Sequence, residues 1–151
     1  MKVEIAMIAI LTILISCGVP PQNKSPHTLI GTWRLLSGTT IEKGNTTVID
    51  YTQNSSFIKI INGSHFAFLK HDLTHGKDST ATFGAGGGSY SLQDSIYTER
   101  LEYCSDRAWE GNDFKFTITI KDDTLIQTGI EKVEKAGVNR LNIEKYIRLK
   151  N

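Results

Sequence analysis

Apolar and polar residues alternate along most of the chain from residue 29 onward. In the segment 114–121, four apolar residues occupy the even positions and four polar residues occupy the odd positions. A repeat of two is that of a β-strand with one buried face, whereas apolar residues on a helix recur every three or four positions. Similar segments predict strands at residues 29–42, 46–51, 57–61, 65–69, 79–83, 90–92, 96–103, 114–121, 124–130 and 141–150.

Short turn sequences separate these segments. Asn62-Gly63 is the strongest hairpin signal, because both residues tolerate the positive φ that tight hairpins use. Residues 84–88 are rich in glycine and predict a flexible turn or a bulged strand, and residues 105–111 predict a single helical turn. Eight to ten short strands joined in this way indicate an all-β fold, either a sandwich or a barrel. An antiparallel up-and-down barrel is favoured, because closure removes exposed strand edges.

Residues 1–16 predict a secretory signal peptide. Residues 5–15 are apolar except for Thr12, and this run is too short to span a bilayer, which takes about 20 apolar residues. The run ends in Leu14-Ile15-Ser16-Cys17, which resembles the lipobox of bacterial lipoproteins, where cleavage precedes the cysteine and its thiol is acylated. An ordinary signal peptide that ends in cysteine, or a short buried helix, is the alternative interpretation.

Residues 17–28 predict a lipidated Cys17 followed by a flexible tether. All three prolines of the chain lie in this segment, and it has no apolar periodicity. Several acyl chains on one residue anchor a protein stably to a membrane. We therefore expect a lipid-anchored protein of the bacterial cell envelope, at the outer membrane, with either the periplasmic or the surface side open.

Composition limits the remaining possibilities. With 151 residues and 39% hydrophobic content, the chain suits one folded domain, which we place at residues 29–151. A formal net charge of +1 provides no electrostatic footprint for nucleic acid. If Cys17 carries lipid, Cys104 has no intramolecular partner, and we expect it to be a small buried hydrophobic residue.

Two separated motifs carry a resemblance to a known family. Gly31-Thr32-Trp33 in the first predicted strand and Arg148 near the end of the last one resemble the lipocalin-like proteins, the calycin superfamily. In that superfamily the arginine packs over the tryptophan and closes one end of the barrel. The residues 87–90, 97–99 and 146–148 are also similar to small uncharacterised lipocalin-like lipoproteins of Bacteroidetes-type bacteria.

The resemblance implies a barrel that binds a small hydrophobic or amphipathic ligand. An eight-stranded barrel has room for one small ligand, or is filled by its own side chains. The residues that we expect around a ligand are Trp33, Phe66, Phe68, Tyr97, Glu99, Leu101, Tyr103, Phe114, Phe116 and Arg148. A carboxylate at Glu99 must be paired if it lies inside, or its pKa rises, and a position at the rim, open to water, is the alternative. The alternation in the last strand leaves its inward face open, and Arg148 on that face would pair with Glu99, contact a ligand carboxylate or pack on Trp33.

Other chemistry has weaker support in the sequence. His71 and His75 lie in a predicted loop, where their spacing imposes no metal geometry. We expect no metal site and no cofactor. No nucleophile motif appears in the sequence, although catalytic groups can also converge from distant strands. We expect a binding protein and not an enzyme. An envelope protein that binds or inhibits another protein through its loops, with a solid barrel core, is the main alternative. An enzyme that uses Glu99 and a tyrosine as acid and base is the third.

Overall fold

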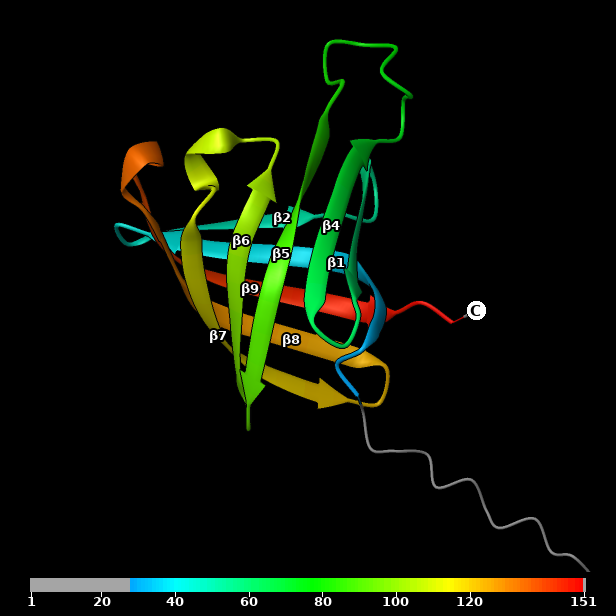
Figure 1. Cartoon of the computed structure of the whole chain (residues 1–151). Coiled ribbons are helices and arrows are strands. Elements are labelled where there is room, and N and C mark those ends of the chain that lie inside the picture. The colour runs from blue at the N-terminus through cyan, green and yellow to red at the C-terminus, as the bar shows by residue number, and fades with distance from the viewer. Residues whose placement is uncertain (1–27, 151) are drawn as a thin grey trace, which may run out of the picture.

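The computed structural model describes residues 28–150, so the predicted signal peptide, Cys17 and nearly all of the tether lie outside the described residues. The described chain is all-β, as predicted (Figure 1). It contains nine strands and two short 3₁₀ helices, η1 and η2. Their bounds are β1 Gly31–Glu42, β2 Asn45–Asp50, β3 Ser55–Ile61, β4 His65–Asp72, β5 Phe83–Gln93, β6 Ile96–Cys104, η1 Arg107–Trp109, β7 Asn112–Lys121, β8 Thr124–Val133, η2 Glu134–Ala136 and β9 Val138–Arg148.

The strands form a closed antiparallel barrel with the predicted up-and-down order. Each strand from β3 to β9 pairs with the next, and β9 pairs with β1 to close the sheet. One edge of β1 serves two partners, because residues 31–34 pair with β3 and residues 37–42 pair with β2. Eight strands therefore close the barrel, and β2 extends it beside the second half of β1. No helix in residues 28–150 is long and apolar enough to cross a bilayer.

The two ends of the barrel differ. The turn at residues 43–44, the loop at residues 73–82, η1 and η2 lie at one end, which we call the mouth; in Figure 1 the loop, η1 and η2 are at the top and the turn is at the left. The turns at residues 62–64, 94–95 and 122–123 lie at the other end, which we call the plug end.

Trp33 and Arg148 close the plug end in the way that the resemblance implied. Trp33 is fully buried, and its indole Nε1 donates a hydrogen bond to the Leu29 carbonyl at 2.8 Å. The Arg148 guanidinium lies 4.1 Å from the centre of the Trp33 ring and donates hydrogen bonds to the carbonyls of Ile30 and Thr28. Gly31 has a φ of 149°, and a Cβ there would overlap the guanidinium. The glycine is therefore needed where the arginine crosses the chain.

The hairpin at Asn62-Gly63 forms, but the expected positive φ is absent. The turn spans residues 62–64, and neither Asn62 nor Gly63 has a positive φ. The Asn62 side chain instead accepts hydrogen bonds from the backbone N–H groups of Ser64 and His65 at 2.9 and 2.8 Å. This local side-chain bond replaces the two-residue turn that the dipeptide favours. The helical turn predicted at residues 105–111 is confirmed as η1.

The strand predicted at residues 79–83 is wrong except for Phe83, where β5 begins. Residues 79–82 belong to the loop between β4 and β5. Asp72, at the end of β4, accepts hydrogen bonds from the backbone N–H groups of Gly76 and Thr82 and from the Thr74 hydroxyl. These bonds hold the pKa of the Asp72 carboxyl well below its usual value. The carboxylate therefore satisfies the loop backbone that a strand would have paired.

A β-bulge in β6 reverses the direction of the side chains that follow it. Gly88 pairs with Leu101 and Gly87 pairs with Tyr103, so Glu102 is an extra residue opposite β5. Up to Leu101 the odd positions point into the barrel. Beyond the bulge Tyr103 points outward and is 68% exposed. The prediction that Tyr103 lines the interior is therefore wrong, because a bulge shifts the alternation by one residue.

Candidate functional site

A cavity of about 350 Å³ occupies the half of the barrel next to the mouth. Ser105, Asp106 and Trp109 line it at the mouth, and Tyr146 lines it deep inside. The volume lies within the range of small-molecule sites, about 300–1,000 Å³. The barrel is thus hollow at this end and filled at the plug end, where Trp33, Leu35 and Leu125 are fully buried.

Two rows of aromatic rings form opposing walls of the cavity. One row runs from Tyr51 over Phe57 to Phe68, with ring centroids 5.8 and 5.7 Å apart. The other runs from Trp109 over Phe114 to Phe116, with centroids 5.8 and 6.4 Å apart. The first row comes from β3, β4 and the residue after β2, and the second from η1 and β7. These strands lie on opposite sides of the eight-stranded ring, so an apolar body between them would contact rings on both sides.

A polar wall separates the two aromatic rows on one side of the barrel. It comes from β8 and β9, whose inward positions carry Gln127, Glu131, Arg140, Asn142 and Glu144. Their outward positions include Ile126 and Ile130, which are 40% and 55% exposed. The structure thus answers the question that the sequence left open for the last strand. The face with Glu144, Tyr146 and Arg148 points inward: Tyr146 bonds to Glu144 inside the barrel, and Arg148 packs on Trp33 at the plug end.

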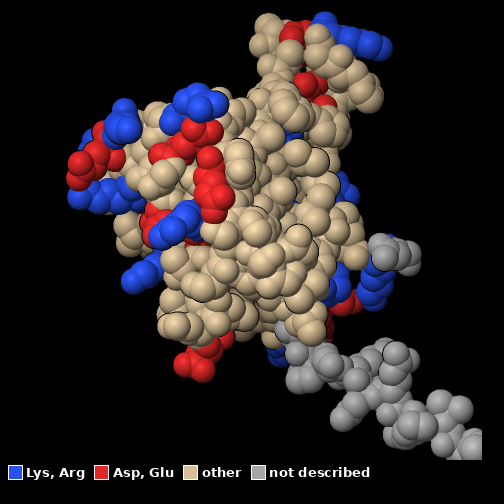
Figure 2. All heavy atoms as spheres, in the orientation of Figure 1, with Lys and Arg blue, Asp and Glu red and all other residues tan. Residues whose placement is uncertain are grey.

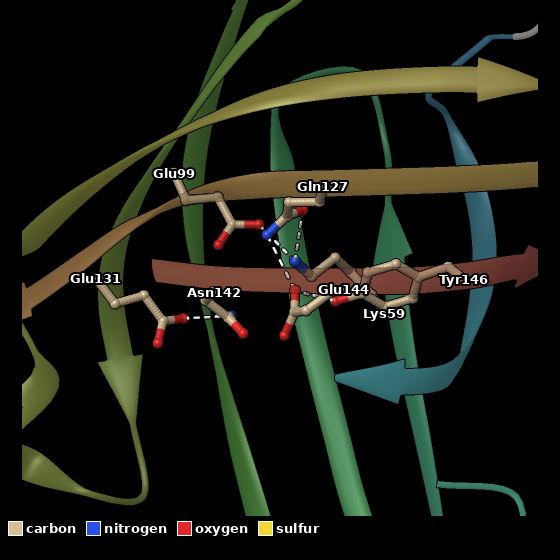
Figure 3. A network of polar contacts seen from close by, with 7 residues as sticks. All are labelled: Lys59, Glu99, Gln127, Glu131, Asn142, Glu144 and Tyr146. Atoms are coloured by element: carbon tan, nitrogen blue, oxygen red, sulfur yellow. Dashed lines mark hydrogen bonds and ion pairs between the residues drawn. The ribbon is translucent and has the colours of Figure 1, made fainter. Parts of the chain in front are cut away.

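Lys59 on β3 is a buried cation that contacts this wall through Gln127 (Figure 3). It is only 3% exposed, and its Nζ lies 2.8 Å from a Glu99 carboxylate oxygen and 3.2 Å from the Gln127 amide oxygen. The ammonium also lies 5.3–6.0 Å from the ring centroids of Phe66, Tyr97 and Tyr146. Burial alone would lower the pKa of Lys59, but the nearby carboxylates outweigh it and raise the pKa. Lys59 is therefore a fixed positive charge.

Glu144 is held by two neutral donors. The Tyr146 hydroxyl donates to its Oε2 at 2.6 Å, and the Gln127 amide donates to the same oxygen at 3.1 Å. Gln127 thus links Glu144 to Lys59, as Figure 3 shows. Burial, together with the charge of Glu144, raises the pKa of Tyr146 well above its usual value, so the phenol stays protonated.

Glu131 is bound on both of its oxygens. Arg140 donates to one at 2.7 Å, and Asn142 donates to the other at 2.8 Å. Arg140 also lies 5.6 Å from the centre of the Trp109 ring, so this pair joins the polar wall to the second aromatic row. Burial and the charge of Glu144 raise the pKa of Glu131, and Arg140 opposes that effect.

The structure brings together only part of the ligand-binding set predicted from the sequence. Five of those residues line the cavity: Phe68, Glu99, Leu101, Phe114 and Phe116. Trp33, Phe66 and Tyr97 are buried below it in the core, where the Tyr97 hydroxyl has no hydrogen-bond partner among the described residues. Arg148 is at the plug end and packs on Trp33, so it neither pairs with Glu99 nor faces the cavity. Of the two positions considered for Glu99, the structure has the inward one: Glu99 is buried, and its partner is Lys59.

Several cavity residues were missed by the sequence analysis. Lys59 lies in the run Phe57-Ile58-Lys59-Ile60-Ile61, where both faces contain apolar residues and a lysine suggests an exposed position. The useful signal was that Lys59 shares its face with Phe57 and Ile61. On β8 the apolar residues Ile126 and Ile130 would be placed inside the barrel by their hydrophobicity. The structure instead exposes them and buries Gln127 and Glu131.

The remaining candidate groups do not form a site. Among residues 28–150, no cluster of histidine, cysteine, aspartate and glutamate side chains is arranged to hold a metal ion. His75 has a φ of 57° in the loop at residues 73–82, whereas His71 lies on β4 and bonds to the Asp72 carbonyl. Cys104 is half-buried beside the cavity, and burial raises the pKa of its thiol. Cys104 is therefore a poor nucleophile at neutral pH.

Comparison with known proteins does not place the chain in a family. No model of a known protein family matches the sequence, and no curated protein matches it. The geometry of the cavity is therefore the basis for the function proposed below.

Proposed function

We propose that this protein is a lipid-anchored, lipocalin-like protein of the bacterial cell envelope that binds one small amphipathic molecule inside its barrel. The observation that carries the proposal is the cavity of about 350 Å³ with two aromatic walls and a polar wall between them. Aromatic side chains accept an apolar body, and fixed polar groups orient the other end of a ligand. Of the two ligand classes expected from the sequence, the polar wall favours an amphipathic one over a purely hydrophobic one.

Two features support the lipocalin-like assignment and the envelope location. The barrel has eight strands in up-and-down order, and Arg148 packs over Trp33 at its closed end. The location depends on the signal-peptide pattern at residues 1–16 and on the lipobox-like sequence that ends at Cys17. The tether at residues 17–28 would join the lipid to the barrel near the plug end, which leaves the mouth facing away from the attachment point.

Binding is favoured over catalysis by the state of the candidate acid and base groups. An enzyme that uses Glu99 and a tyrosine needs both groups free to exchange protons with a substrate. Glu99 is instead bound to Lys59. Burial and nearby carboxylates raise the pKa values of both Tyr97, which is close to Glu99, and Tyr146, which donates to Glu144, so neither is a base at neutral pH. These contacts fit a rigid binding wall better than an acid–base pair.

A second candidate is a protein-binding role. The required solid core is not found, since the barrel contains the cavity. One outer surface nevertheless suits a partner: Ile130, Leu141 and Ile41 are direct cross-strand neighbours on β8, β9 and β1. Ile130 is 55% exposed and Ile41 is 36% exposed. This outer aliphatic row, and not the loops expected from the sequence, is the surface that the second candidate would use.

The test of ligand binding uses an engineered tryptophan on each face of β7. Phe116→Trp places an indole in the cavity, and Lys115→Trp places one on the outer face of the same strand. Both variants are made in a Trp109→Phe background, which removes the native indole from the cavity wall. We expect titration with the neutral aromatic probe N-phenyl-1-naphthylamine to change the fluorescence of Phe116→Trp saturably, at about one probe per protein, and to leave Lys115→Trp nearly unchanged. Native mass spectrometry of the gently purified protein should show a co-purified small molecule.

Each other result has a defined meaning. Equal responses from both variants would show that the probe binds the outer surface, and the second candidate would then lead. No saturable response from either variant, together with a mass spectrum of the bare protein, would contradict the ligand-carrier proposal.

A further inference from the structure

The charges inside the cavity do not balance. Three glutamates line it, and two of them have a basic partner: Glu99 lies 2.8 Å from Lys59, and Glu131 lies 2.7 Å from Arg140. Glu144 has no basic group at ion-pair distance among the described residues. Lys59 is already bound by Glu99, so the deep end of the cavity retains one negative charge in excess.

Glu144 is also incompletely bound. Both of its neutral donors, Tyr146 and Gln127, bond to the same oxygen, Oε2. The other oxygen, Oε1, accepts no hydrogen bond from any residue in the described part of the chain. The carboxylate is thus fixed in orientation on one side and lacks a donor on the other. In a partly buried site, such an oxygen forms a strong hydrogen bond with a charged donor.

No comparable site exists for an anionic group. Lys59 is 3% exposed and enclosed by Glu99, Gln127 and aromatic rings. Arg140 is held by Glu131 and stacks on Trp109. Lys70 and Asp106 carry opposite charges near the mouth and leave no net charge there. A carboxylate or phosphate at the deep end of the cavity would meet the excess negative charge there, whereas Lys70 lies near the mouth, 5.5 Å from the centre of the Tyr51 ring.

We propose that the ligand is an organic cation: an ammonium group on an apolar or aromatic body, with the ammonium bound to Glu144 Oε1. The body lies between the Phe57–Phe68 row and the Phe114–Phe116 row, whose ring faces also favour a nearby cation. This assignment rests on the proposed ligand-carrier function and specifies its ligand class. Glu144 determines the sign of the charge that the cavity accepts, and Tyr146 and Gln127 are its positioning residues.

The experiment compares three probes that share a body and differ at one end. Isothermal titration calorimetry of the purified full-length chain with 4-phenylbutylamine, 4-phenylbutanol and 4-phenylbutyrate separates cation, neutral donor and anion. We expect the amine to bind about tenfold more tightly than the alcohol, because a charged donor strengthens the bond to a carboxylate, and the acid to bind most weakly.

Glu144→Gln should remove most of the preference for the amine over the alcohol, because an amide oxygen attracts an ammonium far less than a carboxylate does. The matched control is Glu134→Gln, which removes the same charge from an 83% exposed side chain on η2 and should keep the preference for the amine. If Glu144→Gln does not fold by circular dichroism, the order of affinities in the wild type decides alone. Equal affinities for amine and alcohol, or tighter binding of the acid, would overturn the assignment and leave the carrier function standing. No saturable binding of any probe would count against the carrier function itself.

Discussion

Lys59 shows how one residue determines the character of the barrel interior. A lysine that is 3% exposed is tolerated only because Glu99 and Gln127 bond to it and because three aromatic rings surround its ammonium. Without Lys59, the carboxylates of Glu99 and Glu144 would repel one another inside the protein. The residue thus makes a polar wall possible in an otherwise apolar barrel.

We therefore predict that Lys59→Met destabilises the protein by about 3–5 kcal/mol, the usual effect of leaving a buried charge without its partner. Adding Glu99→Gln to Lys59→Met should recover part of that loss, because the unpaired charge is then gone. Urea unfolding measures both. Lys115→Met on the exposed face of β7 is the control, with an expected change within about 0.5 kcal/mol. A double variant no more stable than Lys59→Met would show that the ion pair is not the cause.

Arg148 and Trp33 are the second pair whose effect can be measured at this scale. Trp33→Ala should cost about 3–5 kcal/mol, because it removes a fully buried ring. Because the guanidinium lies 4.1 Å from that ring, Arg148→Ala should be coupled to Trp33→Ala by about 1 kcal/mol in a double-mutant cycle of unfolding free energies. Strictly additive effects would mean that the stacking contributes nothing to stability.

At the scale of single elements, the strands were predictable and their local irregularities were not. β7 was predictable in full, because Phe114, Phe116 and Ile118 alternate with polar residues and the structure buries just those positions. Tyr103 was assigned to the wrong face, since alternation carries no signal for the extra residue at Glu102. The strand at residues 79–83 failed because Asp72 satisfies the loop backbone from a distance, which local sequence does not reveal.

The bulge in β6 leads to a prediction for Gly88 on the neighbouring strand. A Cβ at Gly88 would overlap the Arg100 carbonyl, so the bulge and the glycine depend on one another. Gly88→Ala should destabilise the protein by about 1–3 kcal/mol, the range for forcing volume into a packed site. Gly63→Ala is the matched control: nothing lies within 4 Å of its Cβ position and its φ is not positive, so its melting temperature should hold or rise slightly. Equal melting temperatures for the two variants would contradict this account.

At the scale of the whole molecule, fold and site differ in how far the sequence predicts them. The closed barrel follows from regular alternation and short turns, and the Trp33–Arg148 contact follows from the resemblance. The cavity depends on side chains from β3, β6, β8 and β9 that meet only after closure, among them Lys59, Glu99 and Glu144. Their partners are distant in sequence, so the sequence analysis left the face of Glu144 open and did not find Lys59. Charged side chains on the outer surface in Figure 2 gather mainly near η1 and η2, and much of the rest of that face is uncharged.

The proposed anchor gives a prediction at the same scale. Cys17→Ser should prevent acylation and move the protein from the membrane fraction to the soluble fraction, because the tether at residues 17–28 has no other apolar anchor. Cell fractionation and incorporation of labelled palmitate measure the effect, and Cys104→Ser is the control that should change neither. A Cys17→Ser variant that stays with membranes, beside a wild type that incorporates no palmitate, would contradict the lipobox interpretation.

The pairing of β1 with β9 has a consequence for the folding of the newly synthesised chain. These two strands close the barrel, and every strand between them is made after β1 and before β9. During synthesis, β1 therefore has one edge unpaired, and the barrel cannot close until β9, which ends at Arg148, has been made. Closing contacts between such distant segments also make folding slow. A nascent chain that remains open in this way would still be unfolded enough to pass through a membrane channel, as the export that we propose requires.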